Sequence, residues 1–518
     1  MNGKLSLRKK KTDILDARIE TKNKIRKKDN LSTINNKIIS FQTVNEKQYS
    51  IKPIMLNIKD PQLLSFRIKI NNIYSSIEII KPLITNTDIN LIKYGIFLIS
   101  KFFKTLLANN ITSFTITPFL SIDIFTIYKN ILLHNLHDYS LIFEALVSLI
   151  NMSNYPCEIE DNKFSYYPLL LSEEYFQLYD YLISNESTPS EILSMLYSLL
   201  HNLCVESETS RSIINKHKYF SKSVTLLVKG TINNYVTRNI YHFLSKLMID
   251  FDTMSLDDAN RYFNFFQTPL TMDSFCDEVI LINCLFALGY LSHIKVHAFL
   301  INFVVSKVTN RIIEILNSRI KSIDDEINLY GLKVITNLII SQKEIIIQNL
   351  VDIGIIDLYE KYLTTINNDI SYAIVLEREI LISIGNLANF DYNLLIQIIS
   401  NDNIMKYVIL YCDSNDLSVK TKAFEVISII FDFGNETVLL KHEQYLPMII
   451  SHLKKETDRN ILSILVETLN SILYIENNFN VNKSKQYSIQ NGIEDILTRK
   501  EIIDLENVSA LKAFLNNI

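Results

Sequence analysis

The thiol and imidazole side chains that come nearest to a metal-binding set in this chain are Cys276, Cys284, His293 and His297. Such side chains bind zinc in many proteins, but their spacing here is not that of a standard zinc site, and thiols are common in helical cores. No Ser/His/Asp arrangement, Gly-rich phosphate loop or paired-carboxylate signature stands out in a sequence with nine Gly and nine His. We therefore expect no metal, no cofactor and no enzymatic activity.

A second chemically distinctive group is the basic N-terminus. Residues 1–30 hold eleven basic and four acidic side chains, a formal charge of +7, whereas the remaining residues hold 41 basic and 52 acidic ones, or -11. A basic arm on an acidic body can fold back on that body or bind an acidic partner. We expect residues 1–45 to be a flexible arm that becomes helical on binding, and residues 46–518 to be the folded body. Because basic arms also bind phosphates, a nucleic-acid-binding tail is an alternative, although nucleic acid is not the expected partner.

The elements that position these residues are predicted to be helices. The 518 residues include only nine Gly and nine Pro, with apolar residues at helical spacing over segments of 12–18 residues. Such a composition argues against barrels and sandwiches, which need frequent turns. A similar phrase ends at eight places, 42 to 51 residues apart: Asn151, Asn202, Lys246, Tyr290, Asn337, Asn386, Ile429 and Ser471. This period is typical of HEAT and armadillo repeats, so the predicted fold is an all-α, right-handed solenoid of about nine to ten repeats.

Cysteine usage and hydropathy bear on the environment of the chain. The five cysteines are scattered and never form a CxxC pair, which favours a reduced, intracellular protein. The N-terminus is charged rather than apolar, and the longest uncharged stretches, near 105–122 and 279–294, are too polar or too short to span a bilayer. We expect a soluble protein without membrane insertion.

The repeated phrases resemble one family. Those from Phe143 to Asn151, Asn202 to Arg211, Ala287 to Ser292 and Gly492 to Leu497 are similar to motifs of the importin-α (karyopherin-α) family of armadillo-repeat proteins. Leu7-Arg8-Lys9-Lys10-Lys11-Thr12-Asp13 resembles the core of that family's importin-β-binding segment, without the Arg cluster upstream of it, and the match can also slide onto Ile25-Arg26-Lys27-Lys28. The resemblance covers nearly the whole chain. It implies that importin-β is bound through Leu7, Arg8, Lys9, Lys11, Asp13 and Arg18.

The resemblance also implies a groove for a basic cargo peptide. In the family, Asn side chains on each third helix bond to the peptide backbone, Trp side chains one turn earlier hold cargo lysines, and acidic groups neutralise their charge. The residues at matching positions are Asn151, Asn202, Glu206, Phe286, Tyr290, Lys333, Asn337, Glu379 and Asn386. Buried Asn can instead cap helices or bridge stacked repeats, and Phe286 and Tyr290 can be core residues.

The chain departs from the family pattern because it contains no Trp. The Trp positions hold Val147, Ser198, His242, Phe286, Ile382 and Glu425. Losing these rings would cost about 0.5–2 kcal/mol of cation–π energy at each pocket. Lys246 also places positive charge where basic cargo would lie.

The function that we expect is that of a nuclear import adaptor shuttling between cytoplasm and nucleus. It would bind basic nuclear localisation signals in its groove and importin-β through its arm. The C-terminal repeats, near Gly492 to Ile518, would contact the export receptor. The alternative is a divergent armadillo scaffold that binds protein partners but no longer recognises such signals.

Overall fold

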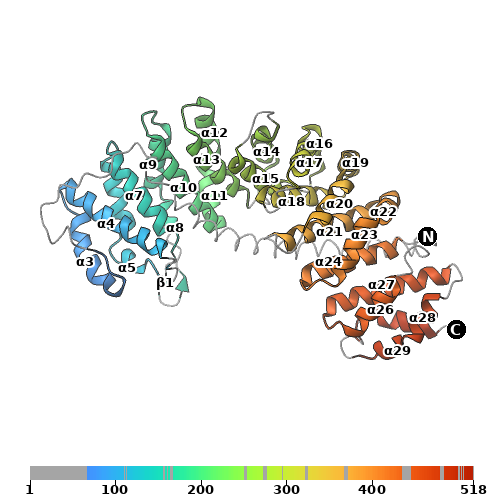
Figure 1. Ribbon diagram of the computed structural model, residues 1–518. Helices are drawn as coiled ribbons and strands as arrows, with labels where there is room; N and C mark the ends of the chain where they lie inside the picture. The colour runs from blue at the N-terminus through green and yellow to red at the C-terminus, as the bar shows by residue number, and fades with distance from the viewer. Residues whose placement is uncertain are drawn as a thin grey trace. The chain divides into compact units, whose positions relative to one another are not determined.

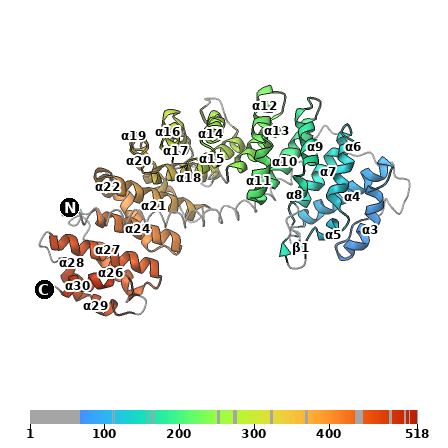
Figure 2. The same cartoon turned by 180° about the vertical axis from the view of Figure 1, so that it is seen from behind.

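The computed structural model describes residues 67–516 apart from gaps at 110, 112–113, 156–157, 160–161, 164–166, 250–253, 272–276, 295, 321–324, 367–371, 434–444, 479–482, 500–501, 503 and 506. The N-terminal arm, with Leu7 to Arg18, lies outside the described residues. The chain divides into two compact units, Met1–Asp250 (unit 1) and Phe251–Ile518 (unit 2). Each unit is a stack of helices, as Figure 1 and the opposite view in Figure 2 show.

Unit 1 contains the helices of the first four repeats. It opens with a short 3-10 helix, η3 (Ile70–Asn72). The first helices of its repeats are α5 (Thr117–Leu120), α8 (Tyr167–Leu170) and α11 (Glu208–Lys216). The second helices are α3 (Ile73–Ile84), α6 (Ile124–His134), α9 (Glu173–Ser184) and α12 (Tyr219–Lys229). The third helices are α4 (Ile89–Ala108), α7 (Tyr139–Met152), α10 (Ser190–Glu206) and α13 (Asn234–Lys246). Between α7 and α8, β1 (Glu158–Ile159) pairs antiparallel with β2 (Asn162–Lys163).

Unit 2 continues with the same kind of repeat. Its first helices are α16 (His297–Val305), α19 (Glu344–Asp352), α22 (Tyr392–Ile399) and α28 (Lys483–Gln490). The second helices are α14 (Leu256–Thr271), α17 (Val308–Ser318), α20 (Ile355–Thr365), α23 (Asp402–Cys412), α26 (Leu446–Lys455) and α29 (Ile493–Ile496). The third helices are α15 (Glu278–Leu291), α18 (Glu326–Ile340), α21 (Ala373–Phe390), α24 (Leu417–Asp432), α27 (Arg459–Asn478) and α30 (Val508–Asn516).

The third helices form the spine of each unit. Each one contacts the third helix of the next repeat, from α4 to α13 in unit 1 and from α15 to α30 in unit 2. They are buried on most sides; in α18, for example, buried residues run from Ile327 to Ile339. All eight sequence positions that mark the period lie on third helices. The fold prediction is therefore confirmed: the chain is an all-α solenoid of armadillo-like, three-helix repeats.

Most third helices begin at an Asp or Asn that caps them. The side chain accepts a hydrogen bond from a backbone N–H two or three residues later, which satisfies a donor that the helix itself cannot pair. The caps are Asp88, Asp138, Asn233, Asp277, Asp325 and Asp416 for α4, α7, α13, α15, α18 and α24. Asp458 does the same for α27. These caps fix where each buried helix starts, and hence which residues reach its C-terminal end.

Polar contacts one repeat apart tie neighbouring repeats together at the surface. Lys222 Nζ lies 2.6 Å from Asp180 Oδ1, and Arg319 Nη2 lies 2.6 Å from Glu278 Oε1. Exposed pairs of this kind are worth at most about 1 kcal/mol each, so they adjust the register of stacking more than they drive it. The apolar surface buried between the helices supplies most of the stabilisation.

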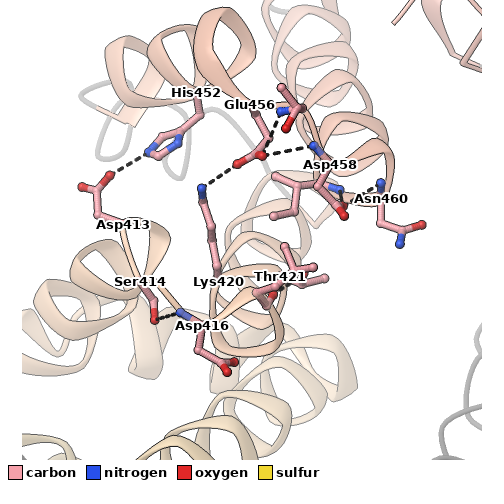
Figure 3. A network of polar contacts seen from close by, with 12 residues as sticks. Asp413, Ser414, Asp416, Lys420, Thr421, His452, Glu456, Asp458 and Asn460 are labelled. Atoms are coloured by element: carbon pink, nitrogen blue, oxygen red, sulfur yellow. Dashed lines mark hydrogen bonds and ion pairs between the residues drawn. The ribbon is translucent and has the colours of Figure 1, made fainter. Parts of the chain in front are cut away.

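A denser polar network joins the repeats near the C-terminal end of unit 2 (Figure 3). Lys420 Nζ on α24 lies 2.5 Å from Glu456 Oε2, directly after α26. The other Glu456 oxygen accepts a hydrogen bond from the Asp458 backbone N–H, just before α27. His452 Nε2 on α26 lies 3.2 Å from Asp413 Oδ1, which follows α23. The network thus links four helices of two consecutive repeats.

Candidate functional site

The eight periodic residues lie near the C-terminal ends of the third helices; we call them the ladder positions. Unit 1 holds those at Asn151, Asn202 and Lys246, and unit 2 holds those at Tyr290, Asn337, Asn386, Ile429 and Ser471. Because successive third helices contact each other, the ladder positions of one unit follow one another along its spine. Asn151, Asn202 and Asn337 are 6–9% exposed, so only a small part of each side chain reaches the surface.

Two ladder asparagines bond to the preceding repeat in the same way. Asn202 Nδ2 donates to Ser153 Oγ at 2.8 Å and approaches the Ile150 carbonyl oxygen at 3.5 Å. Asn337 Nδ2 donates to Ser292 Oγ at 3.1 Å and to the Gly289 carbonyl at 2.9 Å. In each case the acceptors come one residue before and two residues after the preceding ladder position.

This arrangement gives those two asparagines a structural role whatever else they do. With both N–H groups of Asn337 directed at the preceding repeat, the orientation of its carboxamide is fixed. A fixed carboxamide oxygen is an acceptor suited to the N–H of an extended peptide. The bridging interpretation of the sequence and the peptide-binding one are therefore compatible.

The other ladder asparagines have different surroundings. Asn386 Nδ2 donates to the Ile382 carbonyl of its own helix at 2.8 Å, while its backbone carbonyl accepts from Gln342 Nε2 at 3.1 Å. Asn151 is buried near the end of α7. Asn239, which the sequence analysis did not single out, bridges α13 to α10 by donating to Ser194 Oγ at 2.7 Å. The sequence feature that could have identified Asn239 is its position seven residues, or two helical turns, before a ladder position, which places both on the same face of the helix.

The two acidic candidates differ sharply in exposure. Glu206 is exposed at the last position of α10, one turn after Asn202. Glu379, on α21, is 0% exposed, and its Oε1 lies 3.9 Å from Arg378 Nη2. In the described structure Glu206 is open to solvent, whereas Glu379 would have to be uncovered before a peptide ammonium could approach it.

Phe286, Tyr290 and Lys333 are brought together around an aromatic residue that the sequence analysis did not name, Tyr330. The Phe286 ring centroid lies 5.1 Å from that of Tyr290 and meets Tyr330 edge to face at 5.3 Å. Lys333 Nζ lies 5.6 Å from the Tyr330 centroid. Burial raises the pKa of Tyr330, and the hydroxyls of Tyr290 and Tyr372 raise it further. Tyr330 precedes Asn337 by seven residues, so helical spacing alone would place it on the same face.

A pair of histidines joins α13 to α10. The His242 ring stacks on His201 of α10, with centroids 3.8 Å apart and an angle of 19° between the rings. Lys246, one turn after His242, is only 6% exposed. Burial lowers the pKa of His201 well below its ordinary value, and the nearby His242 and Lys246 lower it further. His201 is therefore neutral near pH 7, and Lys246 is the cation beside it at this corner of unit 1.

Two further expectations concern metals and membranes. Within the described ranges no three His, Cys, Asp or Glu side chains come together as a metal site would require, and Cys276 of the suggested set lies outside those ranges. Cys284 is a buried free thiol whose pKa burial raises well above its ordinary value. In the same part of the chain, no helix combines the length and apolar character needed to span a membrane.

Comparison with known proteins identifies similar folds but assigns the chain to no family. Neither a family model nor a curated relative matches the sequence. A crystal structure of an engineered protein shares the fold, with a TM-score of 0.63 at 14% identity, over 85% of this chain and 98% of that one. A designed armadillo-repeat protein for modular peptide recognition aligns at 16% identity with a TM-score of 0.40, over 49% of this chain and 99% of that one. Another, in complex with the peptide (KR)4, aligns at 12% with a TM-score of 0.33, over 56% and 98%. The first of these supports the solenoid fold, and the other two are too distant in shape to support more.

Proposed function

We propose that this chain is a peptide-binding adaptor for nuclear import, which binds basic segments of cargo along its third helices and importin-β through its arm. The observation that carries the proposal is the row of ladder positions, with fixed carboxamides at Asn202 and Asn337 and an exposed carboxylate at Glu206. Oriented amides read an extended backbone, and the carboxylate favours a cargo lysine or arginine.

Net charge supports the same assignment. The sequence beyond residue 30 carries a formal charge of -11, which favours encounter with basic segments and makes the association salt-dependent. Residues 1–30 of the arm carry a formal charge of +7, which favours binding to an acidic partner. In this proposal importin-β is that partner. The proposal includes binding of the export receptor by the C-terminal repeats. It also includes shuttling of the protein between cytoplasm and nucleus.

The direct test is titration of a fluorescent Lys/Arg-rich peptide into the full chain at two salt concentrations. Glu206→Ala should weaken binding about five- to tenfold, because it removes one charge-assisted contact. Glu344→Ala is the matched control, since it also removes an exposed carboxylate, but from α19, outside the third helices. Equal losses in the two variants would show attraction by net charge alone.

The arm is tested separately by capture of the chain on immobilised importin-β. Replacing Arg8, Lys9 and Lys11 by Ala should abolish retention if these residues form the binding segment. Replacing Arg26, Lys27 and Lys28 instead examines the second basic cluster. Undiminished capture of both variants would remove importin-β from the proposal.

Burial of Glu379 and the histidine–lysine corner favour a second candidate function, a divergent scaffold for other protein partners. Both features lower the affinity expected for a basic segment at those positions. Absence of peptide binding into the high micromolar range, with the fold intact, would favour the scaffold over the import adaptor.

A further inference from the structure

The first repeat of unit 1 lacks the cover that the next repeats receive. Within the described residues only the short η3 precedes α3, whereas the first helices α5, α8 and α11 precede α6, α9 and α12. In a solenoid each repeat buries its apolar side against its neighbours, so an end repeat needs a cap over its outer side. We therefore looked for uncovered apolar side chains on η3, α3 and α4, which we call the end repeat.

The end repeat exposes large apolar side chains. The side chain of Tyr74 on α3 is 61% exposed, and that of Ile70 in η3 is 43% exposed. On α4, Leu91 and Phe97 are only partly buried, although they pack against a buried apolar cluster. Aromatic and aliphatic side chains left in water on one end repeat mark a surface that another segment covers.

The described part of the chain begins on this same repeat. Ile68 packs against the buried cluster, which consists of Leu83, Tyr94 and Leu98. The Lys69 backbone N–H donates to Ser76 Oγ at 3.3 Å, and Ser76 Oγ donates to the Asn72 carbonyl at 3.0 Å. These bonds fix the entering chain to the start of α3. Because the chain is continuous, the residues that precede Arg67 in the sequence start from the end repeat.

The sequence of that preceding segment suits a cap. Residues 51–66 contain eight apolar side chains in sixteen positions: Ile51, Ile54, Met55, Leu56, Ile58, Leu63, Leu64 and Phe66. Residues 1–30, by contrast, are mainly polar and carry a formal charge of +7. Residues 51–66 therefore combine apolar character with a direct connection to the end repeat, which the basic arm does not.

We propose that residues 51–66 pack on the end repeat, over Ile70 and Tyr74, and cap unit 1. Burial of apolar side chains of the segment together with those of the end repeat drives the contact. The basic arm is then anchored at the first repeat, whichever partner it binds. This inference goes beyond the proposed function and does not depend on it.

The test uses the full chain with an indole as a probe, because the sequence contains no Trp. Tyr74→Trp places one indole on the end repeat, and its emission and its quenching by acrylamide report its contact with water. Replacing Leu56, Leu63 and Leu64 together by Ser (the segment variant) should shift the emission to longer wavelength and increase quenching. An indole that is already open to water, and that the segment variant leaves unchanged, would overturn the proposal.

Two controls distinguish the cap from other causes. Replacing Ile14, Leu15 and Ile19 together by Ser removes three apolar side chains from the arm and should leave the probe at position 74 unchanged. Tyr235→Trp places the indole on α13 at a side chain that is 45% exposed, where the segment variant should have no effect. If the arm variant matches the segment variant, or if the emission depends on protein concentration, the cover is the arm or a second copy of the chain, and the proposal fails.

Hydrogen exchange of the chain that keeps Tyr74 gives a second readout, in case the indole itself disturbs the end repeat. The segment variant should lower the protection of α3 about tenfold or more, because the contacts of buried leucines are lost, while α13 keeps its protection. Equal protection of α3 with and without the substitutions would contradict the cap. Failure of the import adaptor would show in the basic-peptide and importin-β experiments and leave these results unaffected.

Discussion

At the scale of single residues, two ladder asparagines show how one position in a repeat stabilises its contact with the preceding repeat. Asn202 and Asn337 each use their amide nitrogen to hold the preceding repeat. Losing such a buried bond costs about 1–3 kcal/mol when the partner group is left unsatisfied. Asn at these two places therefore has a structural role in the contact between repeats.

His201 makes the stability of unit 1 depend on pH. Its pKa is lowered in the folded chain by burial, by His242 and by Lys246, whereas in the unfolded chain it returns to about 6.5. Below that value the unfolded state binds the extra proton, so stability is complete above about pH 6.5 and falls with decreasing pH, at up to about 1.4 kcal/mol per pH unit. Hydrogen exchange of α10 and α13, corrected for its intrinsic pH dependence, should show this loss between pH 7.5 and 5.5.

The matched variants for this prediction are His201→Gln and His452→Gln. The pKa of His452 is also lowered, mainly by burial, but this residue lies on α26 of unit 2. His201→Gln should flatten the pH dependence of α10 and α13, and His452→Gln should leave it intact. An unchanged pH profile in His201→Gln would assign the effect to other groups.

At the scale of elements, close packing between helices requires a glycine at position 331 but not at position 289. A Cβ at Gly331 on α18 would lie 2.9 Å from Leu316 Cδ2 of α17. A Cβ at Gly289 on α15 would meet nothing nearer than Val334 Cγ2 at 4.0 Å. The two positions thus separate the steric requirement of packing from the intrinsic helix propensity of Gly.

Replacing each of these glycines by Ala should change stability in opposite directions. Gly331→Ala gains about 1 kcal/mol of helix propensity but overpacks against Leu316, which costs about 1–3 kcal/mol, so a net loss is expected. Gly289→Ala should stabilise by about 0.5–1 kcal/mol because nothing opposes the gain. Calorimetric unfolding of both variants provides the measurement, and stabilisation by Gly331→Ala would show that Leu316 moves aside easily.

Much of the fold could be predicted from sequence because the repeat period and the Asp or Asn caps are local signals. Spacing alone predicts the eight ladder positions and their period, whereas their place on third helices follows from the resemblance; caps such as Asp138 and Asp325 precede their apolar runs. The candidate site was less accessible to such reasoning. Spacing does not tell how deeply a side chain sits in the stack, so Glu206 and Glu379 looked alike, although one is exposed and the other fully buried.

At the scale of the whole molecule, repeat architecture limits how far a local change can spread. Each repeat contacts mainly its neighbours, so stability approximates a sum of repeat and interface contributions. The bonds from Asn337 to Gly289 and Ser292 belong to the interface between α15 and α18. Removing them should weaken this interface while distant repeats keep their own contacts.

We therefore expect Asn337→Ala to act locally. A loss of about 1–3 kcal/mol at the α15–α18 interface should lower hydrogen-exchange protection of these two helices about five- to 150-fold, since about 1.4 kcal/mol corresponds to a factor of ten. Protection of α7 and α10 in unit 1 should stay nearly unchanged. Asn386→Ala is the control, because its amide bonds within α21 and its loss should leave α15 and α18 protected. Equal loss of protection in α7 and α15 on Asn337→Ala would mean instead that the chain opens as one cooperative block, in which case the nearest-neighbour description of this solenoid would fail.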